Sequence, residues 1–458
     1  MALTLRGIKG SPLTYAEADA NFSGLADGSL LTAGSSSIGF LQSGTGAVSR
    51  TAQDKLREVV SVKDFGAVGD GVTDDTVAIQ AAIDSFGSTA VQQRCGRLFI
   101  PCGCAISSTL VAQNKSLIIE GNGWGNTQDT GGHASYLKWI GAAGTPMLKI
   151  INAQGFGIRD IRFVGKSSAK PSAAINFNQQ AGFASESNFL HNVHIGTMDG
   201  DTSDDAVQFT NGILLDGLAS NNSEFLFSNI DIHKCVDGIH VGYTQMIDHV
   251  INQISIDSCT NGIYMCGNAV GSGWKFYNNA VDINQPRLDD AGANCASYVS
   301  INGYHSESAG RLAVLKGGDL TIQSGAFQIT PNANADGKII DASGGGSVCV
   351  ANLVLKDFLW SRSSAPATPP FMDFSGTGGT TGGKSIVLDG VQNQVAFLTG
   401  GTNGLKVLTG DATDVRFVYY RQRVNSTGGV VPAIALNVIG GVGANKEWDI
   451  TRYNVTPY

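Results

Sequence analysis

The sequence predicts an all-β protein built as a solenoid of stacked strands, and three observations support this. First, NIDIHKCVDGIHV (229–241) aligns with QISIDSCTNGIYM (253–265) at a constant offset of 24 residues. Second, apolar and polar residues alternate in many short fragments, as in strands with one buried face. Third, glycine accounts for 60 of 458 residues without a three-residue period, which is about twice its usual share and excludes a collagen-like chain.

The 24-residue offset places like residues above one another in successive turns. Ile230 aligns with Ile254, and Cys235 aligns with Cys259. A repeat of this length is typical of a solenoid in which each repeat forms one turn. We therefore expect the two cysteines to form an interior rung of packed thiols. Residues 95–400 would make about 12 such turns, a stack about 60 Å long.

Alternating fragments extend this pattern along the chain. Each has apolar residues at every second position, so one face of the strand is expected to face the core. They lie at 158–163, 193–195, 212–215, 353–355 and 386–388. A single solenoid domain is therefore predicted for most of the chain.

The composition argues against several classes of protein. Hydrophobic residues make up 42% of the chain, too many for an intrinsically disordered sequence. The formal net charge is −8 without a basic cluster, so no nucleic-acid partner is expected. The start of the chain lacks the apolar core of a secretory signal, and no run of about 18 apolar residues predicts membrane insertion. Eight cysteines are too sparse for a disulfide scaffold, so most are expected to be buried thiols.

The amino-terminal part differs from the rest. Thr14 and Glu17 form a capping-box pattern, which predicts a short helix immediately after Thr14. Residues 26–52 are rich in Gly and Ser, which suits an extended linker or a segment that depends on oligomerisation.

Residues 59–84 predict a strand, a glycine-containing turn and then a helix. Asp74 can cap this helix, and Asp75 lies favourably near the positive end of its dipole. We interpret both carboxylates, together with Asp64 and Asp70, as turn and cap residues rather than as a site. The apolar side of the helix is expected to comprise Val77, Ile79, Ala82 and Ile83.

This segment, VVSVKDFGAVGDGVTDDTVAIQAAID, resembles the opening motif of the pectate-lyase-like right-handed parallel β-helix of phage tailspikes and related depolymerases. The resemblance implies that the solenoid is a right-handed parallel β-helix and that the strand and helix plug one end of it. Such a cover is needed because a solenoid leaves its terminal turn exposed.

The segment GIKGSPLTYAEADANFSGL (7–25) also resembles the adaptor helix of phage tail fibre proteins. Together the two resemblances imply a homotrimer in the virion tail, made in the cytoplasm of the host bacterium. Residues 1–25 would dock on a tail or baseplate protein, and the β-helix would bind capsule or O-antigen polysaccharide.

Four regions follow from this reading. They are an adaptor and linker (1–58), a strand-helix plug (59–94), the β-helix (95–409) and a small β cap or trimer contact (410–458). The last region is predicted from short apolar stretches such as 415–419 and 430–432.

The candidate catalytic residues are carboxylates on the outer face. Asp231 and His233 alternate with isoleucines and so should point outward, and Asp257 should stack at the position of His233. Glycoside hydrolysis needs two carboxyl groups about 5 to 9.5 Å apart, a spacing that adjacent turns supply easily. Glu224, one strand upstream, is the candidate partner acid. The alternative is a solvated face with an Asp–His pair.

A second set of candidates lies further along the chain. Glu307 is a candidate catalytic residue near His305, and an exposed turn carboxylate is the alternative. His233 and His305 are candidate substrate-binding residues, and Trp274 and Tyr277 could stack on sugar rings. The two aromatic residues could equally pack at a trimer seam.

No cofactor and no metal is predicted. The acidic segment 199–205 departs from the EF-hand pattern and is interpreted as a solvated loop or part of a sugar groove, with a cation site as the minor alternative. His191 and His194 are discounted as a zinc pair because residues i and i+3 of a strand point to opposite faces.

The leading functional hypothesis is a tailspike that binds, and cleaves, a surface glycan. The sequence leaves open whether it is an enzyme, with a glycoside hydrolase slightly favoured over a lyase. Arg159 and Arg162, predicted to alternate outward, could serve a lyase by neutralising a uronate. The alternatives are a non-catalytic receptor-binding or structural tail protein of the same fold, and a bacterial polysaccharide lyase.

Overall fold

The computed structural model describes residues 12, 14–15, 34–87, 94–124, 134–180, 184–197, 206–217, 221–242, 245–247 and 249–265, and short segments between 270 and 422. The chain divides into two compact units, Met1–Val60 and Ser61–Tyr458. None of the helices described is both long enough and apolar enough to span a lipid bilayer.

The first unit contains a small hairpin where an extended linker was predicted. Its elements are α4 (Gly34–Ser37), β1 (Gly39–Phe40), β2 (Arg50–Thr51) and α5 (Ala52–Leu56). β1 pairs with β2 in antiparallel fashion, and Thr51 caps α5 by accepting from the amide of Asp54 at 3.0 Å. The extended conformation predicted for the linker is therefore wrong from residue 34 onward, and the alternative, a segment that depends on oligomerisation, stays a prediction. The helix predicted after Thr14 lies outside the described residues, except for residues 14 and 15.

The predicted strand, turn and helix follow, with two further short elements between them. They are β3 (Val59–Ser61), η1 (Val62–Phe65), β4 (Asp70–Asp74) and α6 (Thr76–Ser85). The carboxylate of Asp74 accepts from the amide of Thr76, at the first turn of α6. Asp75 accepts from two turn amides, and Asp64 and Asp70 accept from amides near their own positions. All four carboxylates therefore have the turn or cap roles predicted for them.

The buried face of α6 is narrower than predicted. Ile79, Ala82 and Ile83 are buried, but Val77 is 81% exposed. At about 100° per residue, Val77 lies on the opposite side of the helix from Ile79. The side chain of Gln80 pairs with the backbone of Val111 through two hydrogen bonds of 2.8 and 3.0 Å. These bonds satisfy the backbone N–H and C=O of Val111 at the outer edge of the first solenoid strand.

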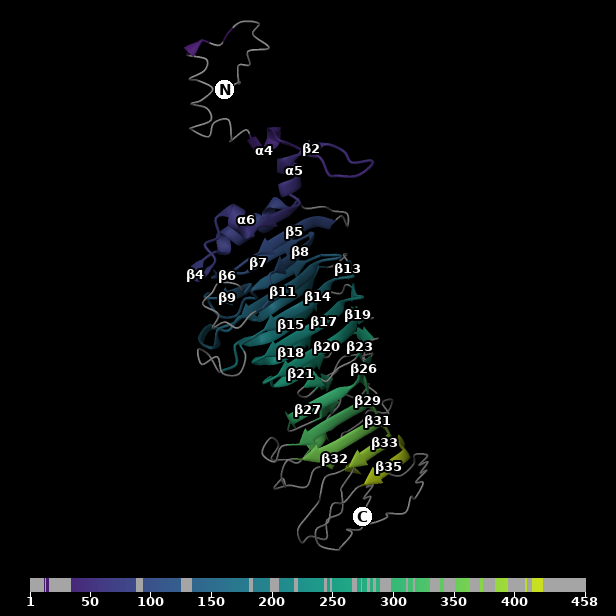
Figure 1. Cartoon of the computed structure of the whole chain (residues 1–458). Coiled ribbons are helices and arrows are strands. Elements are labelled where there is room, and N and C mark those ends of the chain that lie inside the picture. Colours follow the sequence, from purple (N-terminus) through teal and green to yellow (C-terminus); the bar gives the residue numbers. More distant parts are fainter. Residues whose placement is uncertain are drawn as a thin grey trace. The chain divides into compact units, whose positions relative to one another are not determined.

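An 11-stranded parallel sheet forms one face of the second unit (Figure 1). Its strands are β7 (Leu110–Gln113), β10 (Leu148–Ile151), β12 (Ala173–Gln179), β15 (Phe209–Gly217), β18 (Cys235–Val241), β21 (Asn261–Met265), β25 (Pro286–Leu288), β28 (Ala313–Leu315), β30 (Lys338–Asp341), β32 (Phe371–Asp373) and β34 (Leu408–Thr409).

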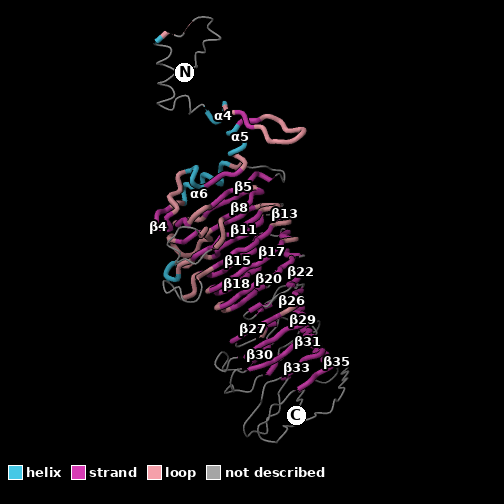
Figure 2. Tube along the Cα trace, in the orientation of Figure 1, coloured by secondary structure: helices cyan, strands magenta, loops and turns pink. Residues whose placement is uncertain are grey.

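A second ladder is formed by longer strands, which lie as a stack of parallel segments in Figure 2. They are β5 (Arg94–Ile100), β8 (Ser116–Gly121), β11 (Gly157–Val164), β14 (Phe189–Ile195), β17 (Leu226–His233), β20 (Val250–Asp257), β23 (Trp274–Tyr277), β26 (Tyr298–Asn302), β29 (Gly318–Ile329), β31 (Ala351–Arg362), β33 (Lys384–Asn393) and β35 (Asp414–Gln422).

Shorter elements complete the turns. They are β6 (Gly103–Ile106), β9 (Tyr136–Trp139), β24 (Val281–Asp282), β27 (Tyr304–Ala309), η2 (Ser167–Ala169) and the four-stranded sheet β13 (Ala184–Glu186), β16 (Asn221–Ser223), β19 (Gln245–Ile247) and β22 (Val270–Ser272). Successive strands of each ladder pair in parallel, so the predicted parallel β-helix is confirmed, and all the alternating fragments predicted from the sequence lie in its strands.

The turns are not of equal length. Ile230 pairs with Ile254, as the 24-residue offset predicts. Phe189, however, pairs with Leu226, an offset of 37 residues. The estimate of 12 equal turns is therefore wrong, because several turns carry additional residues between their strands.

The long strands bend at residues with positive φ. Asp160, Asn192, Asn229 and Gln253 lie at equivalent positions of β11, β14, β17 and β20, with φ between 53° and 58°. The first half of β11 pairs with β8 and the second half with β9, so the strand belongs to two faces. We call these four residues the corner ladder.

The interior is filled by stacked apolar rows. Ile195, Ile232 and Ile256 follow one another in register and are fully buried. Cys235 and Cys259 are buried free thiols, as predicted. At the far end, β35 pairs in parallel with β33, so residues 414–422 continue the ladder instead of starting a separate cap. The stretch 430–432 lies outside the described residues.

Candidate functional site

Beyond the corner ladder, the alternation of inward and outward residues starts again. Ile161 and Phe163 of β11 are buried in the core, and Arg162 between them points to the outer side. In register with Arg162 lie His194 on β14 and Asp231 on β17. Asp257 on β20 pairs in register with His233, two residues after Asp231. Four adjacent strands thus present polar side chains side by side.

Four of these side chains are in contact, and we call them the His–Asp cluster: His194, Asp231, His233 and Asp257. Nδ1 of His194 lies 3.0 Å from one carboxylate oxygen of Asp231. Nε2 of His233 lies 2.8 Å from the other oxygen, and its Nδ1 lies 3.5 Å from a carboxylate oxygen of Asp257. The predicted grouping of Asp231, His233 and Asp257 on one face is present in the structure; a catalytic role for it remains a prediction.

The cluster is buried at one end and open at the other. The side chain of His194 is fully buried, that of Asp231 is 23% exposed and that of Asp257 is 38% exposed. The indole of Trp124 covers the His194 ring at a centroid distance of 4.9 Å, and the rings of His194 and His233 stack at 5.2 Å. Any ligand would therefore reach the cluster from the Asp231 and Asp257 side.

At the buried end of the cluster, the pKa values of His194 and Asp231 are both lowered, but for different reasons. Burial lowers the pKa of His194, and the contact with Asp231 does not offset it. Burial alone would raise the pKa of the Asp231 carboxyl, but its contacts with the two imidazoles outweigh burial and hold the pKa well below its usual range. His194 is therefore neutral and Asp231 ionised at neutral pH.

The two groups at the open end form a charged pair. Burial would lower the pKa of His233, but its contacts with Asp231 and Asp257 raise it to about 9. The contact with His233 in turn lowers the pKa of Asp257. The proton of the cluster at neutral pH is therefore held by an imidazole, and both carboxylates are available as bases.

The same donors suit a metal ion. Ligand atoms from His194, Asp231 and His233 all lie within 4.8 Å of one another. Within the described part of the chain, this is the one group of three or more such side chains close enough to share an ion.

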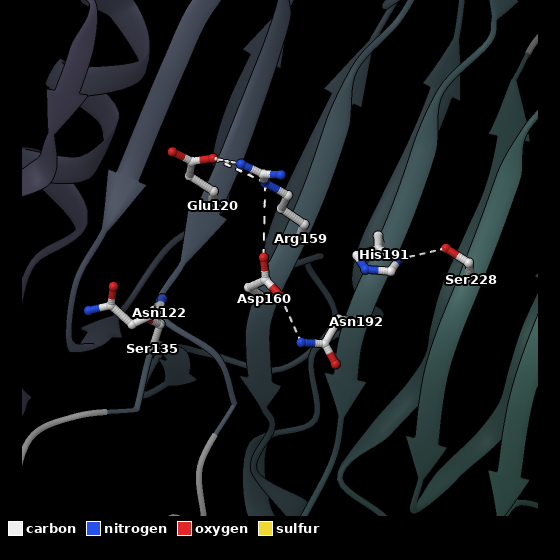
Figure 3. Close-up of polar contacts among 8 residues, drawn as sticks. All are labelled: Glu120, Asn122, Ser135, Arg159, Asp160, His191, Asn192 and Ser228. Atoms are coloured by element: carbon white, nitrogen blue, oxygen red, sulfur yellow. Dashed lines mark hydrogen bonds and ion pairs between the residues drawn. The ribbon is translucent and has the colours of Figure 1, made fainter.

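A separate polar row lies on the face before the corner ladder (Figure 3). Arg159 forms an ion pair with Glu120 on the neighbouring strand, and His191 contacts the hydroxyl of Ser228 at 2.8 Å. Asn252 follows Ser228 in register. The described part of this row offers hydrogen-bonding groups, and Arg159 also lies 3.9 Å from the carboxylate of Asp160.

A second Asp–His pair lies on the 11-stranded sheet. Oδ2 of buried Asp237 lies 2.7 Å from Nδ1 of His240, and its Oδ1 accepts from the amide of Asn261 at 2.6 Å. The hydrogen bonds satisfy the buried carboxylate, as a structural role requires. This pair was not predicted from the sequence.

The structure does not bring Glu224 to the cluster. Glu224 has a φ of 59° and lies before β17, whereas Asp231 lies near the other end of that strand. Seven residues of strand span about 20 Å. The carboxylate of Glu224 contacts the hydroxyl of Ser187 instead. The expectation that Glu224 lies beside Asp231 is therefore wrong, because the whole length of the strand separates them.

The remaining candidates lie further along the ladders. His305 and Glu307 belong to β27, which pairs with β24, and His305 is half-buried. Trp274 and Tyr277 belong to β23. The side chains of Glu307, Trp274 and Tyr277 and the acidic segment 199–205 lie outside what the structure describes. Their roles remain predictions.

His194 is the residue that sequence reasoning missed. It was discounted because His191 and His194 should point to opposite faces of a straight strand. Asn192 bends the strand between them, so each imidazole points outward, but on a different face. The available signal was the recurrence of Asn before the second half of the strand, at Asn192 and Asn229.

The two arginines considered for a lyase are also engaged. Arg159 is paired with Glu120, and Arg162 is buried with its Nε donating to the carbonyl of Gly196 at 2.9 Å. Arg162 points outward as predicted, but it is only 1% exposed and does not reach solvent.

Comparison with known proteins agrees with this fold. Residues 59–264 match the family described as rhamnogalacturonase A/epimerase, pectate lyase-like. This part of the chain belongs to the pectate lyase-like superfamily. The match begins at β3 and ends within β21, so it includes the whole His–Asp cluster.

Curated relatives are similar over short stretches. The chain is 44% identical over 85 residues to a tail spike protein of Shigella phage Sf6, covering 18% of this chain. It is 40% identical over 97 residues, 20% of this chain, to a capsule K30/K69-specific depolymerase of Klebsiella phage K5-2. It is 34% identical over 108 residues, 23% of this chain, to the mannuronan C5-epimerase AlgE6 of Azotobacter vinelandii. These matches span only 12 to 13% of each relative's own length.

Solved structures give more distant matches. The A-module of AlgE6 from Azotobacter vinelandii aligns over 80% of this chain and 96% of its own, with 14% identity and a TM-score of 0.40. The enzymatically active domain of tailspike protein 2 of bacteriophage CBA120 aligns over 84% of this chain and 50% of its own, with 13% identity and a TM-score of 0.41.

Proposed function

We propose that this protein is a phage tail spike, a component of the virion tail that binds and cleaves a bacterial surface polysaccharide. The observation that carries the proposal is the combination of local similarity to a tail spike and to a capsule depolymerase with a parallel β-helix that presents the His–Asp cluster on its outer side. An elongated glycan fits such a surface, because it can contact several neighbouring strands at once.

The cluster supplies an acid and a base. His233 is the proton donor of the proposed reaction, since its pKa is raised to about 9 and it lies between two carboxylates. Asp257, the more exposed carboxylate, is the base, and Asp231 orients and charges His233. Hydrolysis is favoured over elimination, because elimination from a uronate also needs a cation at the sugar carboxylate, and Arg162 is buried.

The test is to incubate the full-length protein with capsule and O-antigen preparations from candidate hosts and to analyse the products by mass spectrometry. Fragments that gain one water support a hydrolase. Fragments with an unsaturated uronate would instead indicate a lyase. Binding to polysaccharide from a host that the phage infects, without release of fragments, would contradict cleavage. It would also exclude the catalytic roles of Asp231, His233 and Asp257.

One observation favours a second candidate function, a receptor-binding spike without catalysis. The pKa of both carboxyls of the cluster is lowered, so neither is the protonated carboxylic acid that glycosidases ordinarily use. In that case the cluster would hold adjacent strands together and present hydrogen-bonding groups to the glycan.

The assembly is also part of the proposal. The chain would form a homotrimer and would dock on the tail or baseplate through residues 1–25, with residues 59–94 closing the β-helix. The contact between Gln80 and the first strand of the 11-stranded sheet supports the closing role. Light scattering of the full-length protein, and virion assembly with a chain lacking residues 1–25, test the two statements separately.

A further inference from the structure

We propose that His194, Asp231 and His233 bind a divalent transition-metal ion of the zinc type. The inference does not rest on the proposed function, since it concerns the free protein and is tested without a glycan. No relative reported above names such an ion.

The spacing of the donor atoms fits a small ion. Zinc bonds of about 2.0 to 2.2 Å in a tetrahedral site separate neighbouring ligand atoms by about 3.3 to 3.5 Å. In the structure each carboxylate oxygen of Asp231 lies 3.0 or 2.8 Å from an imidazole nitrogen, and all three residues offer ligand atoms within 4.8 Å. The two distances to Asp231 are about 0.3 to 0.7 Å shorter than this spacing, so the Asp231 carboxylate would have to move away from both rings to admit the ion.

The ligand types favour a transition metal over calcium or magnesium. Two imidazoles and one carboxylate suit zinc, whereas the hard cations prefer oxygen ligands alone. Three protein ligands leave a fourth position open, as in catalytic zinc sites. Asp231 and His233 are both partly exposed, so this position would face solvent.

The surroundings hold the ligands in place. Asp257 contacts the nitrogen of His233 that does not face Asp231, which is the carboxylate–histidine arrangement typical of metal sites. Trp124 covers the ring of His194 and is itself fixed by a hydrogen bond of 2.7 Å to Asn192. Two imidazole ligands are thus positioned by neighbouring side chains that do not themselves reach the ion.

The charges near the site are compatible with a cation. Asp231 and Asp257 supply two negative charges, which balance a divalent ion. The nearby cation is Arg162, which pairs in register with His194 on the side away from Asp231 and donates to the carbonyl of Gly196. A bound ion would take the place of the proton on His233, so proton donation by His233 in the proposed reaction belongs to the ion-free protein.

Zinc binding by the full-length protein tests the inference directly. The protein is prepared without a polyhistidine tag, stripped with a chelator, dialysed and titrated with zinc chloride by calorimetry, and its metal content is then measured. We expect one ion per chain. The His233→Gln variant should weaken binding by more than about 100-fold, and Asp257→Asn by about 10- to 100-fold.

The matched control is His191→Ala, which removes an exposed imidazole that contacts Ser228 on the neighbouring face. It should bind zinc like the unchanged protein. His233 is partly exposed, so its substitution is better tolerated than that of buried His194, and circular dichroism confirms the fold of each variant. Absence of a stoichiometric ion in the stripped and reloaded protein, or equal binding by His233→Gln, would overturn the inference.

Discussion

Asn192 lies directly above Asp160 in the corner ladder, and its side-chain amide donates to the carboxylate of Asp160 at 2.7 Å. The carbonyl oxygen of the same side chain accepts from Trp124 at 2.7 Å and from Asn229 at 2.8 Å. One side chain thus connects three successive strands and fixes the indole that covers His194. The bend of the strand and the burial of the cluster depend on the same residue.

We therefore expect Asn192→Ala to destabilise the protein by about 4 to 5 kcal/mol. Alanine adopts the left-handed conformation at a cost of about 1 to 2 kcal/mol, and each lost hydrogen bond adds about 1 kcal/mol. The midpoint of denaturant unfolding measures the change. Asn192→Gly is the control, because glycine also loses the side-chain hydrogen bonds but adopts the left-handed conformation without the backbone cost. If the two variants are equally unstable, the left-handed conformation contributes nothing.

The corner ladder also explains what the sequence could and could not predict. Alternation and the 24-residue offset were sufficient to predict stacked parallel strands, because inward isoleucines such as Ile232 must repeat at every turn. The bend at Asn192 was not predicted, since a left-handed residue within an alternating strand leaves a weak signal. Without the bend, His194 could not be placed beside Asp231.

Distances along the chain were harder to predict than contacts between turns. His233 and Asp257 are related by the local repeat, so their pairing followed from the alignment. Glu224 was proposed as the partner acid because it lies one strand upstream, but it precedes β17, and Asp231 lies beyond the bend of that strand at Asn229. The burial of His194 could not be predicted, because Trp124, which covers its ring, comes from a different turn.

The stacked isoleucines predict a contrast between two positions of β17. Ile232→Ala should cost about 2 to 5 kcal/mol, because Ile232 is fully buried and the cavity would not collapse. Leu226→Ala should cost less than about 1 kcal/mol, since Leu226 is 48% exposed. Thermal unfolding of both variants checks the prediction. Similar losses at the two sites would show that Leu226 is covered in the native assembly.

The turn at Asp70 predicts an acid-sensitive contribution to stability. Hydrogen bonds from the amides of Thr73 and Val72 lower the pKa of Asp70 to about 2. Because the pKa is lowered by folding, the stabilisation is present above the unfolded pKa of about 4 and is lost as the pH falls towards about 2. The difference in unfolding midpoint between the unchanged protein and Asp70→Asn should therefore shrink over this range. A difference that is constant from pH 7 to pH 2 would contradict it.

The surroundings of Gly196, beside the His–Asp cluster, leave no room for a larger side chain. Its φ is 96°, and an added Cβ would lie 2.3 Å from the carbonyl oxygen of His233. Gly196→Ala should therefore displace β17 and weaken zinc binding as well as stability. Gly155→Ala is the matched control, because Gly155 also has a positive φ, of 62°, but an added Cβ would meet no atom within 4 Å. Equal effects of the two variants on zinc affinity would exclude the steric explanation.

Substitutions in the His–Asp cluster and at Glu224 should have different effects on the kinetics of glycan cleavage. If His233 donates the proton and Asp257 is the base, His233→Gln and Asp257→Asn should each lower kcat by about 10²- to 10⁴-fold, with a smaller change in KM. Glu224→Gln should leave both constants unchanged, since Glu224 contacts Ser187 at the other end of β17. Fragment release from the purified polysaccharide, measured at several substrate concentrations, separates kcat from KM. A loss of activity in Glu224→Gln alone would place the reaction on another face, and the His–Asp cluster would then serve structure or metal binding only.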